Sequence, residues 1–118
     1  MHTDILKQKS KEFGILSIDL YKFLIKKRLY EIAKQFIRSS TSIGANIAEA
    51  KYAESRKDFI HKLNIALKEA VETKYWLELL SDECTEYSKI VNIRVENESL
   101  IYILIKSIKT AKKKCEQK

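Results

Sequence analysis

The apolar and polar positions of the chain alternate with the period of an α-helix, and they divide the sequence into four segments. We predict helices at about residues 4–26, 30–52, 56–84 and 93–114. The third segment is the most regular, because its apolar or small residues alternate spacings of four and three, as in helices that pack nearly parallel. This seam contains Phe59, Leu63, Ala66, Ala70, Thr73, Leu77, Leu80 and Cys84. Four similar helices with short connections predict an all-α fold, an antiparallel up-down-up-down four-helix bundle, formed by one domain of residues 1–118.

The other segments have apolar lines of their own, and polar runs separate them. These lines are Phe13, Leu16, Leu20 and Phe23, with a second line of Ile18, Tyr21 and Ile25; then Ile32, Phe36, Ile43 and Ile47; and finally Leu100, Leu104, Ile108 and Ala111. The first turn is expected at residues 26–28. Ser55 followed by Asp58 resembles a capping box at the start of the third helix. The polar residues 81–89 are expected to form the longest loop.

Residues 38–50 are small and polar where an amphipathic helix is usually more apolar. The apolar line there is Ile43, Ile47 and Ala50, and the polar line beside it is Ser39, Ser42, Asn46 and Glu49. Gly44 costs roughly 1 kcal/mol relative to Ala inside a helix, which predicts that another backbone comes close. If the first turn centres near Lys27, Gly14 lies opposite Ser40, within about a turn of Gly44. Both glycines are therefore expected at one close approach of the first two helices.

The same arithmetic across the second turn brings Arg38 level with Ala70, which Glu69 and Glu72 flank. We therefore expect a buried ion pair from Arg38 to Glu69 or Glu72. If this pair lies at the surface, it contributes roughly 0–1 kcal/mol. Asn46 is expected to lie level with Lys62.

Composition narrows the class of protein further. The chain has no proline and two glycines, too little turn chemistry for a β-rich fold. No apolar run is long enough to cross a membrane, and residues 1–4 lack the start of a signal peptide, so we expect a cytoplasmic protein without membrane attachment. Cys84 and Cys115 fall at opposite ends of the third and fourth helices, about 30 Å apart at 1.5 Å per residue, so no disulfide is expected between them.

Positive charge is concentrated near both ends of the chain. Residues 1–28 carry a net +4 and residues 106–118 a net +5, whereas residues 29–105 carry −2 of the total +7. In the predicted bundle, the N-terminus, the second turn and the C-terminal tail share one end, which we name the basic pole. Its candidate nucleic-acid-binding residues are Lys51, Arg56, Lys57, Lys109, Lys112, Lys113 and Lys114. Such a pole favours nucleic acid or an acidic partner, although lysine-rich ends are also commonly just solvated.

Patterns typical of catalysis are weak. Asp58 and His61 have the spacing of half a di-metal bundle site, but the second half is missing. There is no glycine-rich phosphate loop and no serine with a positioned base. We therefore expect no catalytic residues, no metal, no cofactor and no enzymatic activity.

The third helix carries a second, half-apolar face with Tyr75, Trp76 and Leu79. In one interpretation this helix is simply the most buried one of the monomer. In the other, which we favour, the face meets a neighbouring subunit, because Trp and Tyr are enriched at interfaces. The chain is then a homo-oligomer.

Three stretches carry a resemblance to a known family: STSIGANIAEA at residues 40–50, SRKDFIHKL at residues 55–63, and ALKEAxETxxWL at residues 66–77. They resemble the four-helix-bundle proteins also called 23S ribosomal RNA intervening-sequence proteins. The resemblance is dense from Gln35 to Leu80 and looser elsewhere. Many members have Gly where this chain has Ala50, a departure expected only to stiffen the end of the second helix.

The resemblance implies a small bacterial antiparallel bundle with relatives that form ring-like pentamers. Some relatives are encoded within insertions in ribosomal RNA genes. A distant branch serves as the accessory protein of a reverse transcriptase in diversity-generating retroelements and binds that enzyme and nucleic acid. The resemblance implies no active site. It carries over Ser42, Asn46, Glu49, Glu69 and Glu72 as structural or interface positions, which join Arg38 and Gly44 as motif residues.

Three hypotheses from different classes follow. The first is a non-catalytic, oligomeric scaffold, most simply a pentamer, whose basic pole contacts RNA, DNA or a polymerase such as a reverse transcriptase. The second is an adaptor that binds another protein through its helix faces and has no nucleic-acid role. The third is an enzyme that uses polar residues of the second helix, and it requires a ligand near Ser42 and Asn46.

Overall fold

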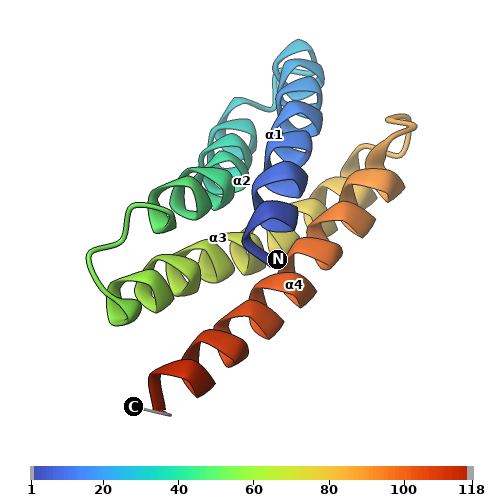
Figure 1. The fold of residues 1–118 in the computed structure, drawn as a ribbon. Coiled ribbons are helices and arrows are strands. Elements are labelled where there is room, and N and C mark those ends of the chain that lie inside the picture. Colours follow the sequence, from blue (N-terminus) through green and yellow to red (C-terminus); the bar gives the residue numbers. More distant parts are fainter. Residues whose placement is uncertain (1, 117–118) are drawn as a thin grey trace.

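The computed structural model describes residues 2–116, and the side chains from Asp4 onward, as four α-helices. These are α1 (His2–Lys26), α2 (Tyr30–Ala50), α3 (Arg56–Glu83) and α4 (Ile90–Glu116). The helices alternate in direction along an elongated bundle of 52 × 21 × 20 Å (Figure 1). α1 and α3 each pack against both α2 and α4. The predicted all-α, antiparallel four-helix bundle is confirmed.

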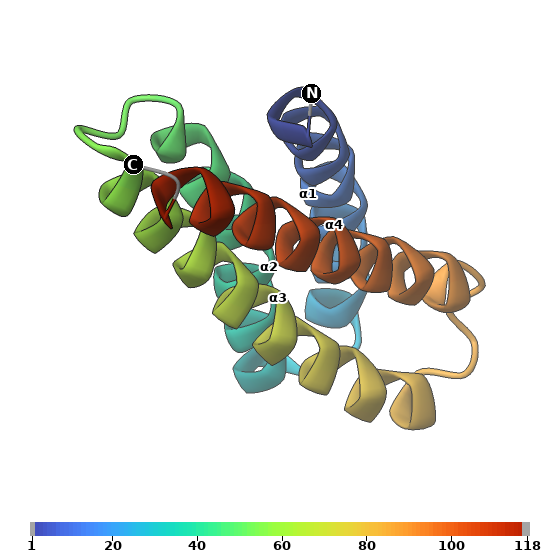
Figure 2. The ribbon, with the colours of Figure 1, turned by 60° about the horizontal axis from the view of Figure 1, so that its bottom comes forward.

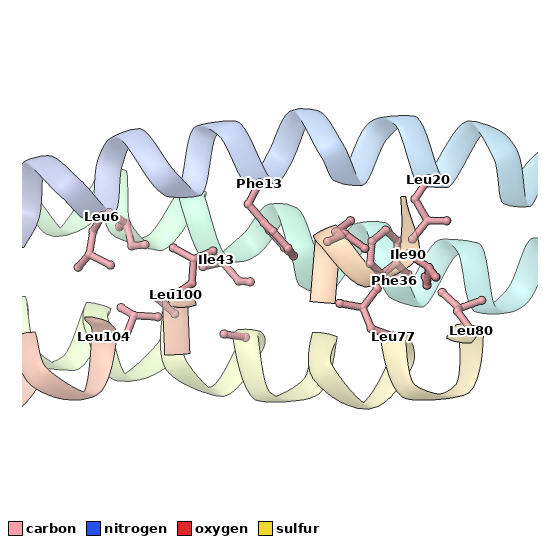
Figure 3. Close-up of a cluster of buried hydrophobic side chains, with 14 of the residues drawn as sticks. Leu6, Phe13, Leu20, Phe36, Ile43, Leu77, Leu80, Ile90, Leu100 and Leu104 are labelled. Atoms are coloured by element: carbon pink, nitrogen blue, oxygen red, sulfur yellow. The ribbon is translucent and has the colours of Figure 1, made fainter. Parts of the chain in front are cut away.

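The core runs along the bundle axis, and all four helices contribute to it. Figure 3 shows Leu6 and Phe13 of α1 facing Ile43 of α2 and Leu100 of α4 across this axis. The seam predicted for α3 is confirmed, because each of its members is buried except Phe59, which is half-buried. The fully buried large side chains therefore follow the four-and-three spacing from which the bundle was predicted.

The buried line of α1 differs from the two lines predicted for it. It consists of Leu6, Ser10, Phe13, Ser17, Leu20 and Leu24. Ile18, predicted to be inward, is 47% exposed, and Leu16 is half-buried. Serine is tolerated in this line because its hydroxyl bonds within the helix, as Ser17 Oγ does to the Phe13 carbonyl at 2.8 Å.

The turn between α1 and α2 lies close to the predicted residues 26–28, since α1 ends at Lys26 and α2 begins at Tyr30. Arg28 has a left-handed backbone with φ of 62°. Its N–H donates to the Ile25 carbonyl at 3.0 Å, and the Leu29 N–H donates to the Leu24 carbonyl at 3.0 Å. These two bonds form a Schellman motif, in which glycine is the usual residue at the left-handed position.

The capping box predicted at the start of α3 is confirmed, except that the Asp58 side chain bonds to the residue before Ser55. Ser55 Oγ accepts a hydrogen bond from the Asp58 N–H at 3.1 Å. The Asp58 carboxylate accepts one from the N–H of Glu54, at 3.1 Å, rather than from Ser55 itself. α2 ends slightly earlier than predicted, at Ala50, and residues 51–55 connect the two helices.

The loop between α3 and α4 is the longest connection, as predicted, but it covers residues 84–89 rather than 81–89 because α3 continues to Glu83. Ser81 bonds its hydroxyl to the Leu77 carbonyl at 2.8 Å within the last turns of α3. α4 begins at Ile90, which is buried, three residues before the predicted start. Tyr87 fastens the loop to α1, since its ring lies 4.9 Å from that of Phe23, between centroids, and its hydroxyl donates to the Asp19 carboxylate. Burial and this hydrogen bond raise the pKa of Tyr87 well above its ordinary value.

Candidate nucleic-acid interface

The register between α3 and α4 sets which residues share the end of the bundle. Asn97 Nδ2–H donates to the Ala70 carbonyl at 3.3 Å, and Lys74 Nζ lies 3.2 Å from Glu98 Oε1. Since the helices are antiparallel, this register brings the last turns of α4 alongside the first turn of α3. Figures 1 and 2 both show the end of α4 beside the start of α3.

The start of α1 and the end of α4 lie at different levels along the bundle axis. Lys9 Nζ lies 3.8 Å from Glu96 Oε1, and Lys89 Nζ lies 3.5 Å from Asp19 Oδ2. At 1.5 Å per residue, this register puts the start of α1 near the level of Leu104. The last turns of α4 therefore extend past α1 and lie against α3.

The structure brings the seven cations of the basic pole to this end. Lys51 caps the end of α2, and Arg56 and Lys57 begin α3. Lys109 and Lys112–Lys114 lie on the last turns of α4, and all seven side chains are exposed. The structure thus gathers in space residues that are up to about half the chain apart in sequence.

None of these seven cations forms an ion pair within the described residues 4–116. Six other cations do, in each case with a carboxylate elsewhere on the bundle. These are Lys9, Lys27, Arg38, Lys62, Lys74 and Lys89. At the far end, for example, Lys27 Nζ lies 2.8 Å from Glu86 Oε2, which joins the first turn to the α3–α4 loop. The basic pole therefore keeps its charges available to an external anion.

A pocket of about 660 Å³ opens at the same pole, between the start of α1, the end of α2 and the start of α3. Its lining residues are Asp4, Lys7, Ile47, Ala48, Ala50, Lys51, Tyr52, Ala53, Ser55, Arg56 and Phe59. The sequence-based prediction included Lys51 and Arg56 but missed Lys7 and Tyr52. The signal for Tyr52 is an aromatic residue in a connection, next to a cation and outside every apolar line.

The ion pairs predicted for Arg38 are present, to both carboxylates. Its guanidinium donates to Glu69 Oε1 at 3.2 Å and to Glu72 Oε2, which also accepts from Trp76 Nε1–H at 3.0 Å. The Arg38 side chain is 48% exposed, so this is a surface network between α2 and α3 and not the buried pair that was expected. Partial burial opposes ionisation of Glu72, but hydrogen bonds from Arg38 and Trp76 outweigh it and lower the pKa of Glu72.

The polar residues of α2 mostly bond to their own helix and to α3. Ser42 Oγ donates to the Arg38 carbonyl at 2.7 Å, and Asn46 Nδ2–H donates to the Ser42 carbonyl at 2.8 Å. Glu49 Oε1 accepts from Lys62 Nζ at 3.0 Å, so Lys62 pairs one turn beyond the predicted Asn46. Ser42 and Asn46 therefore bond within α2, and Glu49 joins α2 to α3.

Close approach of α1 and α2 occurs at Gly44 alone, and the prediction for Gly14 is wrong. A Cβ at Gly44 would lie 3.5 Å from Ser10 Oγ and 3.6 Å from the Ser10 carbonyl oxygen. At Gly14 nothing lies within 4 Å of such a Cβ. Gly14 instead opens onto a mostly apolar groove of about 430 Å³ between α1 and α2, where Ile15 and Ile18 are exposed. The position of Gly14 along the bundle axis was predicted correctly, but the prediction that it faces α2 was not.

The three residues of the candidate interface separate into two groups. Tyr75 and Leu79 are 54% and 40% exposed on the outer side of α3, with Val71 one turn before them. Trp76 is half-buried and packs against the core, and its ring lies 5.3 Å from that of Tyr75, between centroids. The assignment of this face to a neighbouring subunit stays a prediction.

The residues considered for a metal site or a disulfide, Asp58, His61, Cys84 and Cys115, lie in three parts of the bundle. Asp58 caps α3, and His61 is exposed one turn further along. Among the described residues, no three His, Cys, Asp or Glu side chains gather as a metal site. Cys84 is buried at the end of α3 and Cys115 is half-buried near the end of α4, and both are free thiols. Across the residues searched, none of the helices is apolar enough over a sufficient length to cross a membrane.

The helix packing defines the class of protein as an antiparallel four-helix bundle, and the basic pole gives it one positively charged end. The chain belongs to the family of the 23S rRNA-intervening sequence protein, whose model matches residues 3–106. The match ends before Lys109, so Lys109 and Lys112–Lys114 lie outside it.

A solved structure supports this assignment. It is the crystal structure of a protein with unknown function from the S23 ribosomal protein family of Bacteroides thetaiotaomicron. The two sequences are 47% identical, the TM-score is 0.86, and the alignment covers 92% of this chain and 99% of the other. No curated protein matches the chain.

Proposed function

We propose that this protein is a non-catalytic oligomeric scaffold that binds RNA or DNA, or an enzyme acting on them, through its basic pole. The observation that carries this proposal is the gathering of seven exposed cations, without ion pairs within residues 4–116, at one end of the bundle. Nucleic-acid backbones attract such clusters by releasing their condensed counterions. The membership of the intervening-sequence family agrees with a role near RNA, and the proposal rests on the charge arrangement.

Oligomerisation supports this function because a repeated pole multiplies a modest attraction by valency. Exposed apolar side chains on two faces support a homo-oligomer, and the resemblance implies a pentamer. One face is the outer side of α3 with Tyr75 and Leu79, and the other is the outer side of α1 with Ile15 and Ile18. A second copy of the chain is the occupant proposed for these faces.

Binding is tested by fluorescence anisotropy with mixed-sequence RNA and DNA over a range of salt concentrations. The test variant carries Lys112→Glu, Lys113→Glu and Lys114→Glu. We expect it to weaken binding to every sequence and to reduce the salt dependence, because each lost phosphate contact lowers the slope of log K against log salt by about 0.7–0.9.

The matched control carries the same charge change at the far end of the bundle, as Lys22→Glu, Lys26→Glu and Lys34→Glu. These three side chains are also exposed. Equal weakening by both variants would show that only total charge matters. Absence of binding by the natural chain at low salt refutes the scaffold function and leaves the protein adaptor, whose apolar docking depends little on salt.

Assembly is tested by sedimentation at micromolar concentration, where we expect about five times the 13.8 kDa mass of one chain. Leu79→Lys and Ile15→Lys then distinguish the two faces, since a buried unpaired lysine dissociates the interface that contains it. A species of one chain in the natural protein contradicts the oligomer. An intact oligomer in both variants contradicts both faces.

A further inference from the structure

The pocket at the basic pole combines an apolar floor with a cationic rim. Ile47 and Ala50 are buried beneath it, and Phe59 is half-buried at its side. Lys7, Lys51 and Arg56 line the rim against one carboxylate, that of Asp4. A volume of about 660 Å³ lies within the range of small-ligand pockets. The complementary ligand has a flat apolar body and an anionic group beside it.

Tyr52 is the feature that specifies the flat body. It is 79% exposed, more than any other large apolar or aromatic side chain among those described. Tyr87, in contrast, packs its ring against Phe23 and bonds its hydroxyl to Asp19. The contact of the Tyr52 ring is with Lys51, whose Nζ lies 5.9 Å from the ring centroid. The ring therefore contributes little to folding and is available to stack on a ligand.

Two backbone N–H groups beside the pocket are already bonded within the protein. The Asp58 N–H already donates to Ser55 Oγ, and the Glu54 N–H already donates to the Asp58 carboxylate. The cations of the rim carry the positive charge for the anionic group, and two of them flank Tyr52 in the sequence, Lys51 directly and Arg56 across the connection. A phosphate attached to a stacked base lies within reach of such cations.

We propose that this pocket binds one nucleotide unit, an unpaired base stacked on Tyr52 with its phosphate held by Lys7, Lys51 and Arg56. Stacking on an aromatic side chain requires a free base face, so a single strand is bound in preference to a duplex. The cations of the first turn of α3 continue from Arg56 to Lys57 and the end of α4, along which the rest of a strand can lie. This inference rests on the proposed function for the choice of a strand over a free nucleotide.

The test compares a labelled 12-nucleotide single strand, the same sequence as a blunt duplex, and adenosine monophosphate. Tyr52→Ala should weaken binding of the single strand by about 5- to 150-fold, the range measured for losing one base–aromatic stack. Tyr52→Phe should keep binding within about threefold, because its ring stacks in the same way. Duplex binding should stay unchanged in both variants. Tyr30→Ala, which removes an exposed tyrosine at the start of α2, at the far end of the bundle, is the matched control.

The outcomes separate this inference from the proposed function. If the natural protein binds both nucleic acids and Tyr52→Ala changes neither, the pocket is not a base site, although the basic pole still binds nucleic acid. If no strand binds but adenosine monophosphate perturbs the Tyr52 ring resonances, the scaffold function fails and the pocket takes free nucleotides. If neither the strand nor the nucleotide binds, the pocket inference is overturned.

Discussion

The substitution Asn97→Leu should stabilise the protein, because the amide of Asn97 is buried with only one of its two ends bonded. The residue is 1% exposed. Its Nδ2–H donates to the Ala70 carbonyl at 3.3 Å, but its Oδ1 has no hydrogen-bond partner within the described part of the chain. Leucine has the same branching and the same number of heavy side-chain atoms, so it fits the site with little repacking.

The magnitude follows from three contributions. Removing a buried acceptor without a partner gains about 1–3 kcal/mol, and losing one long hydrogen bond costs about 0.5–1.5 kcal/mol. Burying an apolar side chain in place of the amide adds roughly 1 kcal/mol. The Ala70 carbonyl keeps its bond within α3, so no new orphan is created. We expect a net gain of about 1–2 kcal/mol, which for a chain of this length raises Tm by roughly 4–8 °C.

The assay is urea denaturation followed by circular dichroism at one fixed protein concentration, because assembly makes stability depend on concentration. The matched control is Asn92→Leu, which makes the same change at an exposed position of the same helix. It should alter the free energy of unfolding by less than about 0.5 kcal/mol. A loss of stability in Asn97→Leu relative to this control would falsify the reasoning. It would mean that Oδ1 is satisfied in solution, for instance by water from the groove of about 370 Å³ beside it.

Three further predictions concern the fold. Ala66→Leu and Ala70→Leu should each overpack the fully buried seam of α3 and cost about 1–3 kcal/mol, measured by the same denaturation; unchanged stability in both would contradict the position of the seam. Arg28→Gly should add up to about 1 kcal/mol, because glycine adopts the left-handed conformation at that turn without strain. Because the pKa of Glu72 is lowered in the folded state, its ionised carboxylate stabilises the fold above the unfolded pKa of about 4, and this stabilisation is lost as pH falls through the folded pKa. The acid-unfolding curve of Arg38→Ala should therefore lose that part of its pH dependence, and a curve identical to that of the natural protein would refute the coupling.

Periodicity predicted the fold well, because the α3 seam specifies a complete buried face. Where it failed, the sequence lacks the information. Ile18 and Gly14 lie on the side of α1 that faces a groove, and spacing alone does not tell a buried side from a grooved one. The polar residues 81–83 suggested a loop, yet the last turn of a helix at the end of a bundle can be polar on every side.

The candidate site could be predicted only in part, for a different physical reason. Charge counting along the chain identified the basic pole, since antiparallel helices of known length bring distant segments to one end. Lys7 and Tyr52 line one pocket at that pole because the start of α1 lies beside the connection of residues 51–55. That arrangement depends on how far along the bundle α1 begins, which helix lengths predicted to within a few turns do not determine.

The order of helix packing has a consequence for how the chain folds during its synthesis. α2 packs against α1 and α3, the helices on either side of it in the chain, so most contacts of the first three helices join neighbours in sequence. Such local contacts form quickly, and the N-terminal part of a chain can fold while the rest is still being made. The last turns of α4, with Lys109 and Lys112–Lys114, leave the ribosome after everything they pack against. We therefore expect the nascent chain to form the α1–α2 hairpin first, to add α3, and to acquire the full charge of its basic pole only after the end of α4 has emerged.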